Sequence, residues 1–185
     1  KNTEAEWTTT EEYLERNKDK NENKIYYTFD DTHSSHMLSL YKERGLEVLH
    51  TNTQIDNHFI AFLEGKLSPT KFQRIDSGLD DNILDKDKEK SVLDADGRTE
   101  AARIVDIVKA QVEEKNIEVE AKSLASTALP GFIMFDESSR RLRDSFKATN
   151  SEINDWSAFE KKTFVVNTNN PLIESLGDLK EKDPA

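Results

Sequence analysis

Apolar residues in the first half of the chain follow two alternating spacings. Short apolar runs at residues 25–29, 46–50 and 71–75 predict three strands, because β-branched and aromatic side chains fit a pleated, half-buried surface. Between the runs, apolar residues such as Met37 and Tyr41 recur at helical spacing. Strands joined by helices pair in parallel, since each connection returns to the same edge of the sheet. The pattern therefore predicts a small three-layer α/β unit with a parallel sheet.

Polar residues indicate where two of these helices begin. Thr9 stands three residues before Glu12, and Thr53 stands three before Asp56, which is the spacing of a capping box. The helix after Thr53 is apolar over much of its circumference. One buried stripe needs fewer apolar residues, so we expect part of this helix to face a partner. Its apolar residues are Ile55, Phe59, Ile60, Phe62 and Leu63.

The composition changes at residues 76–97 to Asp, Lys and Glu, which predicts a charged linker and a boundary near residue 90. Beyond it, the pattern predicts an α+β sandwich. Its expected elements are a helix over 99–115, strands over 117–121, 132–135 and 163–166, a helix capped by Asp136, and a last helix from Pro171 to about Leu179. We therefore expect two domains, residues 1–90 and 91–185.

Charge and composition exclude several classes of function. The 185 residues have a net charge of −11, which disfavours nucleic acid as a partner, because phosphate binding needs clustered Lys and Arg. No cysteine is present, which excludes disulfides and thiolate chemistry. No apolar run is long enough for a membrane helix, so we expect no membrane partner. The chain begins at Lys1 rather than Met, and we expect it to be a piece of a longer protein.

Candidate metal and catalytic sites are weak. His33 and His36 could share a helical face, but zinc needs three or four convergent ligands, so we expect no metal site. No glycine-rich phosphate loop and no Gly-x-Ser-x-Gly elbow occurs. The alternative from another class is a small α/β enzyme or receiver-like signalling domain. Its site would lie at the carboxyl ends of the strands near Thr51, with magnesium held by Asp30 and Asp31.

Residues 139–147 combine Leu142 and Phe146, four residues apart, with a polar and basic surround. In one interpretation, this is an ordinary surface helix whose two apolar side chains face the core, which helical patterning alone favours. In the other, it is a partly exposed edge that accepts apolar segments of other proteins. The basic residues around it are Arg140, Arg141, Arg143 and Lys147.

Several short blocks resemble one family. They are Tyr13-Leu14-Glu15-Arg16, Lys24-Ile25-Tyr26-Tyr27, Gly45-Leu46-Glu47-Val48-Leu49 and Ile55-Asp56, followed much later by Asn170-Pro171-Leu172-Ile173. In this order and spacing they resemble the 90-kDa heat-shock chaperone family, bacterial HtpG. The first blocks are similar to the distal part of its middle domain. The last is similar to the end of its C-terminal domain, although many members have His where this chain has Asn170.

The resemblance implies a fragment of a cytoplasmic, ATP-driven chaperone that is a dimeric clamp around partly folded client proteins. In the family, ATP and magnesium bind an amino-terminal domain that has no counterpart here, so we expect no ATPase activity and no cofactor in this piece. The helices that form the dimer follow the last block, so we expect the fragment to be a monomer or a weak dimer.

The resemblance also places part of the client-contact surface on this chain. By position, one part is His58, Phe59 and Ala61, and the other is Ser139, Leu142 and Phe146. Some relatives have Trp in place of His58 and Met in place of Ser139. We therefore expect the surface of this chain to be less apolar than theirs.

Overall fold

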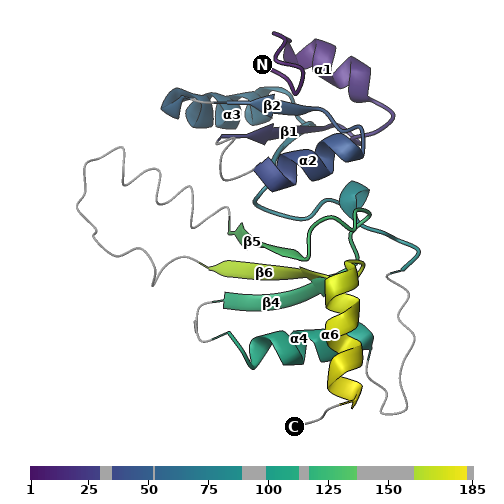
Figure 1. The fold of residues 1–185 in the computed structure, drawn as a ribbon. Coiled ribbons are helices and arrows are strands. Elements are labelled where there is room, and N and C mark those ends of the chain that lie inside the picture. Colours follow the sequence, from purple (N-terminus) through teal and green to yellow (C-terminus); the bar gives the residue numbers. More distant parts are fainter. Residues whose placement is uncertain (30–34, 52, 89–98, 113–116, 137–160, 183–185) are drawn as a thin grey trace, which may run out of the picture. The chain divides into compact units, whose positions relative to one another are not determined.

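The chain forms two compact units with mixed α/β structure, Lys1–Ile83 and Leu84–Ala185 (Figure 1). The computed structural model describes the chain except for residues 30–34, 52, 89–98, 113–116, 137–160 and 183–185, and it leaves out the side chains of 54, 57 and 177–182. Each unit contains its own sheet. Within the described ranges, no helix has the length and apolar character needed to cross a membrane.

Unit 1 alternates helices and strands, as the apolar spacing predicts. Its elements are α1 (Thr10–Asn17), β1 (Lys24–Thr28), α2 (Ser35–Glu43), β2 (Val48–His50), α3 (Gln54–Lys66), β3 (Lys71–Arg74) and the short 3-10 helix η1 (Asp81–Ile83). The strands lie in the order β2-β1-β3, and both pairs are parallel. The predicted parallel sheet is therefore confirmed.

Helices lie against both faces of this sheet. On one face, Ile25 and Tyr27 of β1 pack in a buried cluster with Tyr13 of α1 and Ile60 of α3. Tyr26 points to the opposite face, where its ring meets the ring of Tyr41 from α2 edge-on, with centroids 5.0 Å apart. Successive residues of β1 thus contact different helices, as the two-residue period of a strand requires.

The predicted helix ends are formed by the predicted residues. The Thr9 hydroxyl accepts a hydrogen bond from the Glu12 N–H at 3.2 Å, and the Glu12 carboxylate accepts one from the Thr9 N–H at 3.0 Å. At α3, the Thr53 N–H donates to the Asp56 carboxylate at 2.9 Å. Gly45 follows α2 with φ +65°, a conformation that residues with a Cβ rarely adopt.

The acidic segment after β3 belongs to unit 1 up to Ile83, so these residues of the expected linker pack within the unit. Asp80 is 2% exposed and forms an ion pair of 2.7 Å with Lys24, and Asp76 pairs with Arg74 at 2.9 Å. Ile83 is completely buried. Composition indicated a solvated segment because it counts charges but does not show that these carboxylates have cationic partners within the unit.

The outer edge of β3 is occupied by a side chain. Among the described residues, β3 has a strand neighbour on one side only, and its inward N–H groups face β1. The Phe72 N–H donates to the carboxylate of Glu64 from α3 at 3.1 Å. One backbone donor at this sheet edge is therefore satisfied within the unit.

Unit 2 contains a mixed sheet. Its elements are α4 (Glu100–Lys109), β4 (Ile117–Lys122), β5 (Gly131–Phe135), β6 (Lys162–Asn167) and α6 (Pro171–Lys182). The strand order is β4-β6-β5, with β4 parallel and β5 antiparallel to β6. α4 ends earlier than the pattern predicts, and α6 continues further. The helix predicted after Asp136 lies outside the described residues.

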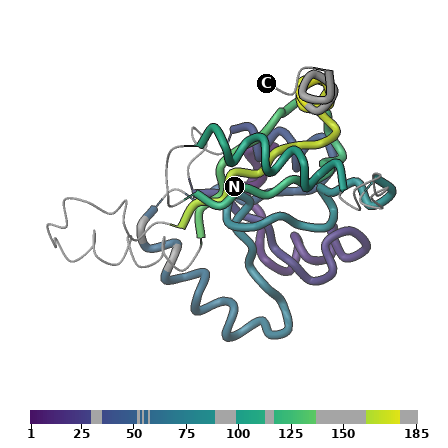
Figure 2. The backbone as a smooth tube through the Cα atoms, turned by 90° about the horizontal axis from the view of Figure 1, so that it is seen from below, coloured from purple at the N-terminus to yellow at the C-terminus, as the bar shows by residue number. Residues whose placement is uncertain are grey.

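The core of unit 2 lies between the sheet and its helices. Ile104 of α4 and Ile173 of α6 pack with Val119 and Val166 of the strands. α6 stands across the strand direction in Figure 1 and is seen nearly end-on in Figure 2. Gly131 permits the close approach of β5 and β6, because a Cβ there would lie 2.7 Å from the Val165 carbonyl oxygen.

A single asparagine side chain organises the loop between β4 and β5. Asn167 is fully buried, and its Oδ1 accepts hydrogen bonds from the N–H groups of Leu124 and Asn169. Its Nδ2 donates to the carbonyl oxygens of Ser126 and Leu129, both at 2.8 Å. Nearby, Asn170 accepts the Leu172 N–H at the start of α6. The asparagines before Pro171 therefore have structural roles.

Candidate functional site

The outward side of α3 exposes three large apolar side chains. Ile55, Phe59 and Phe62 are 71%, 55% and 56% exposed. They stand four and three residues apart, so they follow one side of the helix. Ile60, by contrast, is buried against the sheet. We call Ile55, Phe59 and Phe62 the α3 stripe.

The residues predicted from the family resemblance divide into two sets. His58, Phe59 and Ala61 lie on α3 and are all exposed, next to or within the α3 stripe. The second set, Ser139, Leu142 and Phe146, lies outside the described residues. Its position relative to α3 therefore stays a prediction, as does the role in client contact of all six.

Exposure of the α3 stripe costs free energy in water. Single exposed apolar residues are common on protein surfaces, but a run of adjacent ones typically marks an interaction site. The Lys66 ammonium lies 5.7 Å from the centroid of the Phe62 ring. This contact places a positive charge directly on the aromatic surface.

A cavity of about 680 Å³ lies beside α3 within unit 1. We call it the α3 cavity. Its apolar lining includes Leu49, Ile60 and Phe72, which also belong to the core or pack against it. Trp7, 83% exposed, and Phe59 stand at its solvent side. Its polar lining includes five threonines, Thr3, Thr8, Thr10, Thr51 and Thr53.

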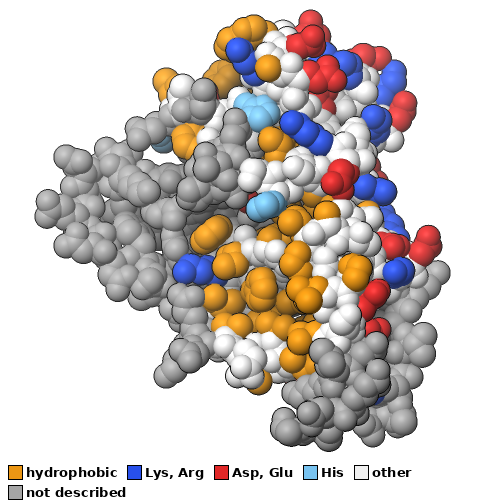
Figure 3. Space-filling view, viewed as in Figure 1, with side chains coloured by type: hydrophobic (Ala, Val, Ile, Leu, Met, Phe, Trp, Pro, Cys, Tyr) orange, Lys and Arg blue, Asp and Glu red, His pale blue; other side chains and the backbone are white. Residues whose placement is uncertain are grey.

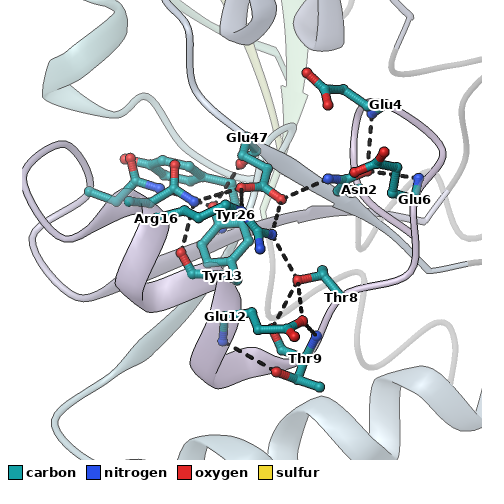
Figure 4. A network of polar contacts seen from close by, with 12 residues as sticks. Asn2, Glu4, Glu6, Thr8, Thr9, Glu12, Tyr13, Arg16, Tyr26 and Glu47 are labelled. Atoms are coloured by element: carbon teal, nitrogen blue, oxygen red, sulfur yellow. Dashed lines mark hydrogen bonds and ion pairs between the residues drawn. The ribbon is translucent and has the colours of Figure 1, made fainter.

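The segment before α1, which forms one wall of the α3 cavity, is held by a polar network (Figure 4). The Asn2 Oδ1 accepts hydrogen bonds from the N–H groups of Glu4 and Glu6, at 3.1 and 2.9 Å. Its Nδ2 donates to the Glu47 carboxylate at 3.0 Å. Arg16 of α1 reaches the same carboxylate at 2.8 Å. Glu47 thus ties this wall to the body of unit 1.

The Glu47 carboxylate is held in its charged form. Burial acts to raise its pKa, but hydrogen bonds from Arg16, Asn17 and Asn2, together with the positive charge of Arg16, outweigh burial and lower the pKa below its ordinary value. At neutral pH the network therefore joins a carboxylate to a guanidinium and two amides.

The alternative magnesium site gains no support from the described residues. Thr51 follows β2, and its hydroxyl donates to the Thr28 carbonyl oxygen at 2.9 Å, so it completes the strand end. Asp30 and Asp31 lie outside the described residues. Among the part of the chain that is described, no group of three His, Asp or Glu side chains could hold a metal ion.

Unit 2 also exposes apolar side chains. Figure 3 shows hydrophobic side chains gathered over its strands. Ile133 of β5 is 45% exposed, and Leu172 and Leu176 of α6 are 67% and 36% exposed. The two leucines stand four residues apart and are exposed, whereas Ile173 between them is buried.

Sequence reasoning did not identify Trp7 or the α3 cavity. Trp7 belongs to no periodic pattern, and the cavity depends on how a non-helical segment packs against α3. The signal for the α3 stripe was the excess of apolar residues on one helix. For Trp7, the available signal was a large aromatic residue in an otherwise polar stretch.

Comparison with known proteins points to one family. A family model described as "Hsp90 protein" matches residues 1–185. Chaperone protein HtpG of Porphyromonas gingivalis is 28% identical over 173 residues, which cover 90% of this chain and 25% of that protein. The proteins of the same name from Bacteroides fragilis strain YCH46 and Shewanella denitrificans are also 28% identical, over 77% and 91% of this chain. The chain spans about a quarter of the length of these relatives.

Proposed function

Because the chain belongs to the Hsp90 protein family, we propose that it captures non-native client proteins through the α3 stripe. Members of this family are chaperones, and the similar proteins are named chaperone protein HtpG. The observation that supports client capture here is the exposure of Ile55, Phe59 and Phe62 on one side of α3. Nothing in the family assignment supports the alternative enzyme or receiver-like domain.

We propose that unit 1 is the distal part of the chaperone's middle domain and that unit 2 is its C-terminal domain, an α+β sandwich without the terminal dimerisation helices. The order of the motif blocks supports this assignment, and so does the parallel sheet of unit 1. On this proposal, the whole protein is an ATP-driven, dimeric clamp in the cytoplasm. ATP and magnesium would bind outside this piece, which would itself hold no cofactor.

Client capture by this surface would be mainly hydrophobic. Burying a large apolar side chain contributes about 1.5–3 kcal/mol, so two or three such contacts give a weak, reversible attachment once the entropy of association is subtracted. The exposed His58 and Ala61 are small or polar, which limits the apolar area. We further propose that Ser139, Leu142 and Phe146 contribute a second contact, with the neighbouring arginines attracting acidic clients.

The test compares variants in binding a reduced, alkylated protein that cannot refold. Replacing Phe59 and Phe62 together by Ser should weaken binding about tenfold or more, because two apolar contacts are lost. The control is Leu172→Ser, which removes an even more exposed apolar side chain from α6. Isothermal titration calorimetry measures the affinities, and circular dichroism checks that each variant is folded.

Equal affinity of the wild type and the Phe59/Phe62 double variant would contradict a client site on α3. A separate double variant, Leu142→Ala with Phe146→Ala, tests the second contact. If it binds like the wild type while the α3 variant does not, the client surface of this piece is confined to unit 1.

A further inference from the structure

Resting on the proposed client-binding function, we infer that the α3 cavity receives an apolar side chain from an extended client segment whose neighbouring residues are acidic. The α3 stripe is an exposed side of a helix, whereas the α3 cavity beside it is concave and can enclose a side chain. Phe59 belongs to both, because it lies on the stripe and lines the cavity. A segment lying along the stripe would therefore pass the opening of the cavity.

The lining of the cavity suits an apolar side chain. Its inner part is formed by Leu49, Ile60 and Phe72, while Trp7 and Phe59 expose aromatic surface at the solvent side. The volume of about 680 Å³ falls in the range of about 300–1,000 Å³ that is usual for binding pockets. It is therefore large enough for one side chain and the backbone on either side of it.

The wall opposite α3 is already in place. Asn2 holds the turn around Glu4 and Glu6 and is joined to Glu47, as described above. A wall that is fixed before binding loses little conformational entropy when a ligand enters. The cavity thus differs from a surface that must first be ordered by its partner.

Charges around the opening favour acidic neighbours in the client. The Lys1 ammonium lies 5.3 Å from the centroid of the Trp7 ring, Lys42 lines the cavity, and Lys66 lies over Phe62 on the stripe. Asp56 is the one carboxylate among the described lining residues, and it accepts the Thr53 N–H at 2.9 Å.

Among the described residues that line the cavity, Lys1 and Lys42 outnumber the one carboxylate, that of Asp56, whereas the whole chain has a net charge of −11. Charges more than about 8 Å apart are largely screened at physiological salt, so the charges that line the cavity count for more than distant ones.

The experiment uses Trp7 as its own reporter. The chain has two tryptophans, so a Trp156→Phe background leaves only Trp7, whose emission should shift to shorter wavelength when a ligand covers the ring. Three short peptides serve as probes: Phe between two Asp residues, Phe between two Lys residues, and Ala between two Asp residues. We expect the first to bind severalfold more tightly than the second, with the difference shrinking at high salt. The third should give no shift.

A cavity-filling variant tests the location. Thr10 lines the cavity at the start of α1 and is partly buried, so Thr10→Phe should occupy the space and weaken binding of the first peptide about tenfold or more. Glu11→Phe adds the same ring at the next, exposed position, which does not line the cavity, and should have little effect. Urea unfolding verifies that both variants are folded.

The outcomes separate this inference from the proposed function. If an unfolded protein binds through the α3 stripe but Thr10→Phe and Glu11→Phe behave alike, the cavity is not a client site. Equal affinity for the acidic and basic peptides would also overturn the inference. If no variant or wild-type chain binds an unfolded protein at all, the proposed function itself fails.

Discussion

The hydroxyl of Tyr13 makes three hydrogen bonds inside unit 1, although the side chain is completely buried. It donates to the Glu47 carbonyl oxygen at 2.7 Å and accepts from the Asn21 amide at 3.0 Å and the Tyr26 N–H at 3.2 Å. Burial is the main reason that its pKa is raised well above the ordinary value for tyrosine. The hydroxyl therefore stays neutral and joins α1, β1 and the residue before β2.

Tyr13→Phe should destabilise the chain by about 1–3 kcal/mol, because a buried N–H and a buried carbonyl oxygen lose their partner. Tyr41→Phe is the matched control. Tyr41 is equally buried, but its hydroxyl has no hydrogen-bond partner among the described residues, so its removal should be neutral or slightly stabilising. Urea unfolding measures both changes. Equal losses of stability would show that the Tyr13 hydrogen bonds contribute nothing specific.

Glu47 should make the stability of unit 1 depend on pH. Its pKa is lowered in the folded state, so the folded chain binds fewer protons than the unfolded one, and the stabilisation is lost as the pH falls below about 4. Glu47→Gln should be less stable than the wild type at pH 7, and the difference should shrink as the solution is acidified. Urea midpoints at several pH values test this. A difference that stays constant with pH would argue against a charged Glu47.

At the scale of elements, η1 differs most from the sequence-based expectation, because it is packed into unit 1 although its segment is highly charged. Ile83→Ala should cost about 2–5 kcal/mol, as expected for a buried aliphatic side chain, because Ile83 is fully buried despite its charged surroundings. Leu79→Ala, in the same acidic segment but only partly buried, should cost clearly less. Thermal and urea unfolding of the two variants measure the contrast. If both changes were harmless, this segment would be a linker after all.

Most elements could be predicted from the sequence because their apolar spacing is regular. The strands of unit 1 and the start of α1 at its Thr9 cap are examples. The order β4-β6-β5 could not be predicted, since a strand pattern does not specify which neighbour the strand will pair with. The burial of Asp80 depends on Lys24, which lies far away in the sequence, so composition alone pointed to a linker.

The candidate site was predictable in part. The excess of apolar residues on α3 predicted that some would be exposed, and Phe59 is exposed. The α3 cavity was not predictable, because its wall depends on the Asn2 side chain meeting Glu47, a contact across 45 residues of sequence. Local patterns contain no information about such a contact.

At the scale of the molecule, we expect the chain to sediment as a monomer of 21.2 kDa. Among the described residues of unit 2, the exposed large apolar side chains are Ile133, Leu172 and Leu176, whereas a stable interface buries at least about 1,200 Å². Analytical ultracentrifugation at micromolar concentration tests this, with Leu172→Ser as the comparison. A sedimenting mass of twice 21.2 kDa that falls to the monomer mass in Leu172→Ser would instead identify α6 as a dimer contact.

Glu64 and Phe62 lie two residues apart on α3, yet they affect two different kinds of intermolecular contact, side-chain packing and backbone hydrogen bonding. Phe62 offers apolar surface, while the Glu64 carboxylate occupies the Phe72 N–H at the rim of the sheet. An edge strand with unpaired N–H and C=O groups can hydrogen-bond to an unfolded polypeptide, which then adds as a further strand and can lead to aggregation. With that donor occupied, a strand added at this edge would lose one of its backbone hydrogen bonds. On the proposed function, this contact would hinder a client held at the α3 stripe from adding to the sheet as a further strand.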